Sequence, residues 1–114
     1  MSDVRQEGLL VCEPLADSVH GLRLIGELDL ATVRYLKEVC DGLEGEGPVT
    51  LDLSELTFVD STGLHALVLY ARENNARGPL ILANPSGFVL RVMQIMKLDG
   101  HPALEIRMDG HGQQ

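Results

Sequence analysis

The strongest constraint on the fold is a change of hydrophobic period between residues 49 and 71. Apolar and polar residues alternate over 49–53, which is the pattern of a half-buried strand. Over 64–71 the apolar residues recur at positions i, i+3, i+4 and i+7, which is the pattern of one helical face. Between the two segments lies the sequence TFVDSTG, residues 57–63. We therefore expect an apolar strand to run directly into a helix at DSTG.

Strand-like and helix-like segments alternate along the rest of the chain as well. The strand-like segments are 9–12, 22–28, 49–53, 80–83 and 104–108, and the helix-like segments are 30–43, 64–71 and 88–98. Asp29 stands in the N-cap position of the first helix, and 80–83 is apolar on every residue, as in a central strand. The order β-β-α-β-α-β-α-β predicts an α/β fold. Its mixed sheet would open with an antiparallel hairpin and continue with βαβ units, with the helices packed on the sheet.

The chain of 114 residues is long enough for one hydrophobic core and contains no internal repeat or linker. We expect residues 9–108 to form a single domain. Residues 1–8 are expected to be a lead that precedes it, and residues 109–114 a frayed tail.

The formal net charge of -8 argues against two classes of partner. Nucleic-acid binding needs cations that replace phosphate counterions, and adhesion to an anionic membrane needs a basic surface. We therefore expect no direct nucleic-acid or membrane contact, whereas a basic protein surface remains a suitable partner. The start, MSDVRQEG, lacks the features of a signal peptide, so the expected location is the cytoplasm.

The cysteines and histidines give no indication of a metal site. Cys12 lies in a strand-like segment and Cys40 in a helix-like one, so both are expected to be small buried hydrophobic residues. The four histidines are scattered and lack the spacing of metal ligands. We expect neither a metal nor a cofactor.

On local pattern alone, DSTG is best interpreted as a helix cap. Asp60 is a good N-cap, because its carboxylate can accept a backbone N–H and its charge suits the helix dipole. Ser61 and Thr62 are common in a first helical turn. Gly63 permits close packing or an unusual backbone angle.

Three chemical functions compete with the cap. A serine nucleophile would need G-x-S-x-G and an aligned base, but only His65, one turn beyond Ser61, is near in sequence. Phosphate binding at the helix N-terminus would lack the glycines and lysine of a P-loop, and Asp60 would repel the anion. An aspartyl-phosphate receiver would need an acidic pair after the first strand, where only Glu13 occurs. Weak binding of a nucleotide therefore stays open as a function of this segment, whereas an aspartyl-phosphate receiver is excluded.

Three segments together resemble a known family. They are GELDLAT at 26–32, VTLDLSELTFVDSTGL at 49–64 and LANPSGFVLRVMQIMKLDG at 82–100. With these motifs at these distances, the chain is similar to STAS domains from about residue 9 to residue 108, and in particular to the stand-alone bacterial anti-sigma factor antagonists.

The resemblance implies a regulator that is not an enzyme. In that family a cognate anti-sigma factor, a serine kinase with a histidine-kinase-like ATPase fold, phosphorylates the first hydroxyl of D-S-[ST]-G and thereby loses its binding partner. A phosphatase restores binding. The implied acceptor here is Ser61, with Thr62 as the fallback.

The partner surface that the resemblance implies includes Asp29 and Asp60 beside the acceptor, together with Gly63. His65 stands where many relatives carry a small residue, so it is either a specificity contact on the rim or an ordinary exposed helix residue. Two alternative functions remain open at this point. One is a STAS scaffold subunit of a transport or stress-signalling complex, and the other is a weak nucleotide-binding module.

Overall fold

The structure is a computed structural model that describes residues 5–7, 9–16, 20–43 and 45–108. Nine helices and strands and one short 3-10 helix follow one another along this part of the chain. The strands are β1 (Arg5–Glu7), β2 (Leu10–Pro14), β3 (Gly21–Leu28), β4 (Thr50–Val59), β5 (Leu80–Ala83) and β6 (Leu104–Arg107). The helices are α1 (Val33–Asp41), α2 (Ser61–Glu73) and α3 (Gly87–Ile95), and the 3-10 helix η1 is Asn75–Arg77.

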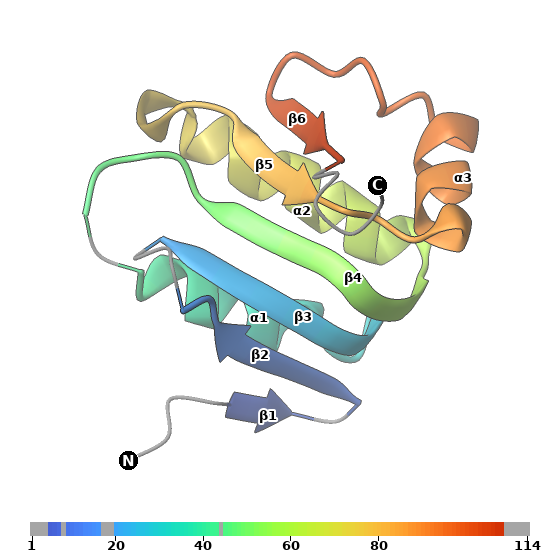
Figure 1. Cartoon of the computed structure of the whole chain (residues 1–114), viewed down its shortest axis with the longest axis horizontal. Helices are drawn as coiled ribbons and strands as arrows, with labels where there is room; N and C mark the ends of the chain where they lie inside the picture. The colour runs from blue at the N-terminus through green and yellow to red at the C-terminus, as the bar shows by residue number, and fades with distance from the viewer. Residues whose placement is uncertain (1–4, 8, 17–19, 44, 109–114) are drawn as a thin grey trace.

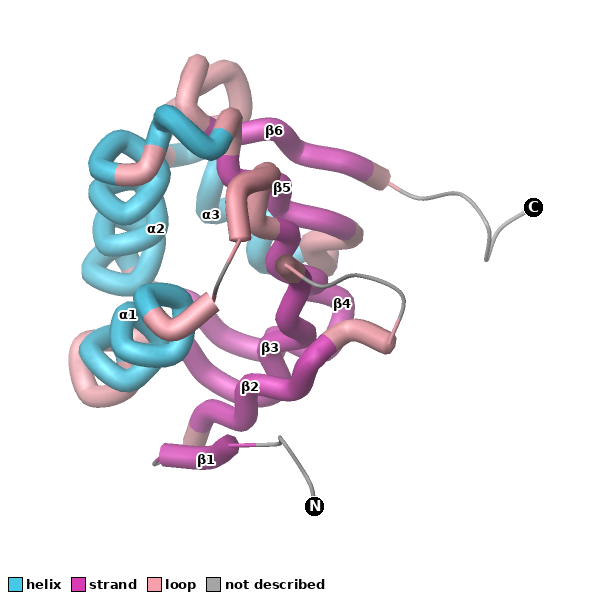
Figure 2. The backbone as a smooth tube through the Cα atoms, turned by 90° about the vertical axis from the view of Figure 1, so that its left-hand side faces the viewer, coloured by secondary structure: helices cyan, strands magenta, loops and turns pink. Residues whose placement is uncertain are grey.

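The six strands form one mixed sheet in which the spatial order is the same as the order in the chain. The pairs β1–β2 and β2–β3 are antiparallel, whereas β3, β4, β5 and β6 run parallel to one another (Figure 1). The predicted α/β class, with an initial antiparallel hairpin followed by βαβ units, is confirmed. Each crossover steps to the next strand in the same direction, so right-handed connections place α1 and α2 together on one face (Figure 2).

The hydrophobic core lies between the sheet and these helices. Leu24, Leu51 and Leu82 of the three central strands are fully buried, as are Leu64 of α2 and Met93 of α3. All four residues of β5 are buried, as the continuous apolar run predicts.

The two cysteines are buried in this core, as predicted. Burial raises the pKa of the Cys40 thiol to about 12, so Cys40 is a neutral apolar side chain at physiological pH.

The structure contains a strand that the sequence analysis did not predict. Arg5–Glu7 lies within the segment assigned to the lead and pairs with β2 at the edge of the sheet. Its residues are polar and therefore show no hydrophobic pattern, but an edge strand needs only backbone hydrogen bonds on one side. The expected boundaries of the domain stay a prediction, and the expected frayed tail, 109–114, lies outside the described residues.

The third helix is shorter than the predicted span of 88–98, because the chain leaves the helix after Ile95. Lys97 has a positive φ of 60°. Its N–H donates to the carbonyl of Gln94 at 3.0 Å, and the N–H of Leu98 donates to the carbonyl of Met93 at 2.9 Å. This is a Schellman termination, which sequence patterns signal by glycine at the position that lysine occupies here.

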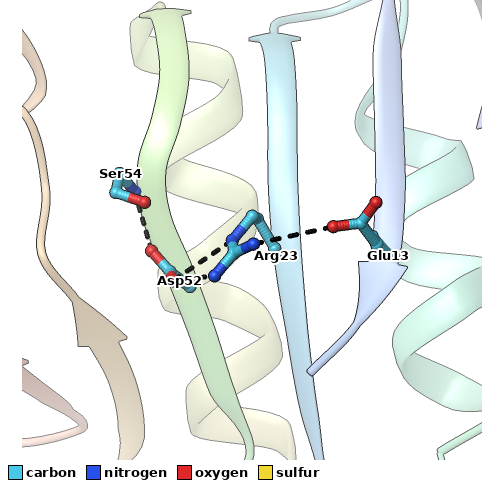
Figure 3. A network of polar contacts seen from close by, with 4 residues as sticks. All are labelled: Glu13, Arg23, Asp52 and Ser54. Atoms are coloured by element: carbon cyan, nitrogen blue, oxygen red, sulfur yellow. Dashed lines mark hydrogen bonds and ion pairs between the residues drawn. The ribbon is translucent and has the colours of Figure 1, made fainter. Parts of the chain in front are cut away.

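The sheet face away from α1 and α2 carries a network of charges across three strands (Figure 3). The Arg23 guanidinium lies 3.7 Å from a carboxylate oxygen of Glu13 and 3.3 Å from one of Asp52. Burial would raise the pKa of Asp52, but hydrogen bonds from Ser54 and Arg23 outweigh it and lower that pKa. The charges of this network are therefore paired within the chain.

Candidate functional site at the start of helix α2

The DSTG segment forms the junction between β4 and α2. β4 ends at Val59, and Asp60 is the N-cap of α2 in an extended conformation. Its Oδ1 accepts the backbone N–H of Gly63 at 2.9 Å, which satisfies one of the N–H groups that have no partner within the helix. The predicted role of Asp60 as the cap is confirmed.

Gly63 explains why the junction lies so close to the neighbouring strand. A Cβ at this position would be 2.6 Å from the carbonyl oxygen of Leu28, the last residue of β3. The backbone N–H of Asp60 donates to the same oxygen at 3.3 Å. Gly63 is therefore required by a close approach of two backbones, and this approach places GELD beside DSTG.

The loop after β3 differs in detail from its prediction. Asp29 is not the N-cap of α1, which begins at Val33 with Thr32 in the cap position. The Asp29 carboxylate instead accepts the N–H of Ala31 at 3.0 Å, and its backbone carbonyl accepts the N–H groups of Thr32 and Val33. Asp29 thus forms an Asx turn at the position where its sequence pattern predicted the start of a helix.

Thr32 holds this turn in place from inside. Its side chain is buried, its hydroxyl donates to the carbonyl of Glu27 at 2.9 Å, and it accepts the N–H of Asp29 at 3.0 Å. Asp29 is therefore held in a defined position at the edge of the sheet that also carries the DSTG junction.

The three other residues expected at the site all lie on the surface. Ser61 and Thr62 are the first two residues of α2 and are exposed, and His65, one turn further, is exposed as well. Within the part of the chain that the structure describes, no hydrogen bond joins the Ser61 hydroxyl to the His65 ring. The geometry thus gives a serine nucleophile no aligned base, and it presents the hydroxyls to solvent.

The chemistry that this arrangement permits is modification or contact by another molecule. The Ser61 hydroxyl stands at the positive end of the helix dipole, where the first N–H groups favour an added anion. The Asp60 carboxylate adjoins it in the chain, and the Asp29 loop lies beside it across the paired strand ends. A dianionic group on Ser61 would thus be tolerated by the fold but would add to a negative surface.

An aromatic pair near the junction was missed by sequence reasoning. The rings of Phe58 and Phe88 stack with their centroids 6.0 Å apart and an interplanar angle of 23°. Phe58 precedes the junction in β4, and Phe88 lies in the first turn of α3. Phe58 is the last residue but one of β4, and Phe88 lies a few residues after the end of β5. Parallel strands end at a common edge, so the pair could be found only once the order of the strands in the sheet is known.

An apolar groove between α1 and α2 was also not predicted. It has a volume of about 230 Å³ and is lined mainly by apolar side chains, among them Leu36, Leu69 and Tyr70.

Two further kinds of feature are absent from the described residues. Among them, no group of three His, Cys, Asp or Glu side chains is arranged to hold a metal ion. None of the helices in the described ranges has the length and apolar character needed to cross a membrane.

The fold and this junction define a class of protein: a mixed-sheet α/β domain with an aspartate-capped, exposed serine where a central strand meets a helix. The family model for the STAS domain matches residues 15–109 of the chain. The chain therefore belongs to the STAS domain family.

One similar solved structure is described as the "Structure of the Anti-Sigma Factor Antagonist SpoIIAA in its Unphosphorylated Form". It is 24% identical to this chain over 83% of this chain and 86% of that one, with a TM-score of 0.61. The likeness shows that the two proteins share their fold. No curated protein sequence matches the chain.

Proposed function

We propose that this chain is a cytoplasmic anti-sigma factor antagonist that is inactivated by phosphorylation of Ser61. In the unphosphorylated state it binds a cognate anti-sigma factor, a serine kinase with a histidine-kinase-like ATPase fold, and so releases the sigma factor. The kinase transfers the γ-phosphoryl group of ATP to the Ser61 oxygen, which gives up its proton, and ADP leaves. A phosphatase hydrolyses the phosphoserine and restores binding. The chain itself is the substrate and has no catalytic role.

The observation that carries the proposal is the position of Ser61. Its hydroxyl is exposed at the start of α2 and is not needed for the cap, because Asp60 supplies the cap. Membership of the STAS family supports the proposal, as does a fold shared with a protein described as an anti-sigma factor antagonist.

Electrostatics explain how such a switch would work without unfolding the protein. A phosphate adds about -1.5 to -2 charges and three acceptor oxygens, and helix N–H groups stabilise it in place. Against a partner surface that accommodates Asp29 and Asp60, this extra charge would be uncompensated. A loss of only about 2.7 kcal/mol lowers affinity a hundredfold, so no large change of shape is needed.

The test is phosphorylation and binding with purified anti-sigma factors of the histidine-kinase-like class. Wild-type protein and Ser61→Ala and Thr62→Ala variants are incubated with each kinase and labelled ATP, and the phosphosite is mapped by mass spectrometry. We expect label on wild type and Thr62→Ala but not on Ser61→Ala. Equal labelling of Ser61→Ala would refute Ser61 as the acceptor.

Binding of the same kinases by calorimetry tests the switch itself. Ser61→Asp introduces a charge at the acceptor and is expected to weaken binding at least tenfold, while the Ser61→Ala variant keeps the affinity of wild type. If no kinase of this class binds wild type, the sigma pathway is excluded. Capture of a transporter ATPase by the native protein would then support a STAS scaffold subunit, and saturable binding of labelled GTP or ATP would support a nucleotide-binding module.

A further inference from the structure

The aromatic residues of this chain divide into two pairs with opposite environments. Tyr35 and Tyr70 are each only 7% exposed, as is usual for large side chains in a core. Phe58 and Phe88, the two phenylalanines of the sequence, are 39% and 49% exposed. The most apolar aromatic side chains thus lie at the surface, so the core does not explain their positions.

The phenylalanine pair connects two elements next to the proposed acceptor. Phe58 lies three residues before Ser61 in β4, and Phe88 is the second residue of α3. The first turns of α2 and α3 lie at the same end of the sheet, where β4 and β5 finish (Figure 1). The stacked rings therefore form an exposed apolar surface, and only Val59 and Asp60 separate Phe58 from Ser61 in the chain.

The stack is suited to binding a partner. Each ring holds the other, so little side-chain freedom remains to be lost on association. Aromatic side chains bury a large area with few rotatable bonds, and they are enriched among the residues that contribute most to interface energies.

The acidic residues beside Phe58 define what the partner must offer. Glu27 of β3 is the cross-strand neighbour of Phe58, Asp60 follows Phe58 by two residues, and the whole chain carries a net charge of -8. A complementary surface therefore needs an apolar pocket for the rings and lysine or arginine side chains beside it.

We propose that Phe58 and Phe88 form the apolar anchor through which this chain docks on its anti-sigma partner, in a pocket bordered by basic residues. This inference rests on the proposed function, and it adds the residues that determine partner affinity. Ser61 controls whether the complex forms; the phenylalanine stack supplies much of the affinity that the phosphate must overcome.

The test compares alanine substitutions at two residues whose side chains are equally exposed. Phe88→Ala removes one ring of the stack, and Leu69→Ala removes a side chain that is also 49% exposed but lies on the α1–α2 groove. Calorimetry with the anti-sigma kinase that binds wild type is expected to show at least about 30-fold weaker binding for Phe88→Ala. The affinity of the Leu69→Ala variant for the kinase is expected to remain within about threefold of the wild-type affinity.

Phosphorylation kinetics give a second readout of the same anchor. Phe88→Ala should lower kcat/KM for Ser61 phosphorylation by a similar factor and leave kcat at saturation nearly unchanged, because the ring is needed for docking and not for transfer. Phe58→Ala is measured in parallel, with urea unfolding of every variant to show that each remains folded at the assay temperature.

The outcomes separate the anchor from the function on which it rests. If wild type binds and is phosphorylated while both phenylalanine variants behave like Leu69→Ala, the anchor is refuted and the proposed function stands. If no such kinase binds wild type, the proposed function has failed first. If sedimentation shows that wild type dimerises and Phe88→Ala does not, the stack is a contact between copies of this chain and the anchor proposal is overturned.

Discussion

The starts of α2 and α3 place serine in two different roles. At α3, Ser86 is itself the N-cap, and its hydroxyl accepts the N–H of Val89 at 3.3 Å. At α2 the cap is Asp60, so Ser61 is the first residue of the helix and its hydroxyl faces solvent. Both helices follow parallel strands at the same end of the sheet. A shift of one position relative to the cap thus decides whether a serine hydroxyl is used by the fold or is available to another molecule.

The glycines at the starts of α2 and α3 also differ, in how much space surrounds them. A Cβ on Gly63 would meet the carbonyl oxygen of Leu28 at 2.6 Å and the Leu28 side chain at 2.9 Å. A Cβ on Gly87 would have nothing within 4 Å. The start of α2 therefore lies close against the end of β3, just before Asp29, whereas at the start of α3 the space beside Gly87 is open.

The largest effect is expected from alanine at these two glycines. Gly63→Ala forces α2 away from β3 and should lower the free energy of unfolding by about 2–3 kcal/mol, as overpacked sites commonly do. Gly87→Ala should leave it unchanged or raise it by up to about 1 kcal/mol, because alanine restricts the unfolded chain without a clash. Urea unfolding followed by circular dichroism measures both, and equal stabilities would contradict the asymmetry.

Removal of either helix cap is expected to have a smaller effect on stability, and the effect should be similar at the two helices. Asp60→Ala and Ser86→Ala each remove the side chain that accepts an N–H in the first turn, and each should cost about 1 kcal/mol of stability. The pair separates stability from function, because Ser86→Ala should still be phosphorylated on Ser61. Loss of Ser61 labelling in a folded Ser86→Ala protein would show that the two helix starts are not independent.

The smallest effect on stability is expected at the proposed acceptor itself. Ser61→Ala removes an exposed hydroxyl that takes no part in the cap, so the free energy of unfolding should change by less than about 0.5 kcal/mol. Compared with Ser86→Ala in the same urea titration, this variant should unfold at the midpoint of wild type. A loss as large as that of Ser86→Ala would mean that the Ser61 hydroxyl belongs to the fold.

Most of the fold was predictable because its signals are local. The change of period at DSTG, the alternation over 49–53 and the apolar run 80–83 each reflect which side chains must leave water. The predicted class and the antiparallel start are confirmed. The strand Arg5–Glu7 could not be predicted, since its pairing partner and not its own residues makes it a strand. The early end of α3 also escaped prediction, because Lys97 occupies a position where glycine is usual.

The candidate site was predicted only in part, for a related reason. The cap at Asp60 follows from the residue and its place before a helical pattern, and it is confirmed. The same reasoning was wrong for Asp29, where an Asx turn with buried Thr32 delays the helix to Val33. The stack of Phe58 on Phe88 joins residues thirty positions apart, which no local pattern could bring together.

The sequence by itself determined the order of elements, the core faces and the helix start that leaves Ser61 outside its cap, because each depends on side chains within one or two turns. Only the tertiary structure decided what surrounds that serine. The sheet aligns the ends of β3 and β4, so the Gly63 backbone can approach Leu28 and bring the Asp29 loop beside Asp60. The crossover to α3 then sets Phe88 on Phe58. These contacts depend on strand register and on the path of the chain, which local periodicity does not encode.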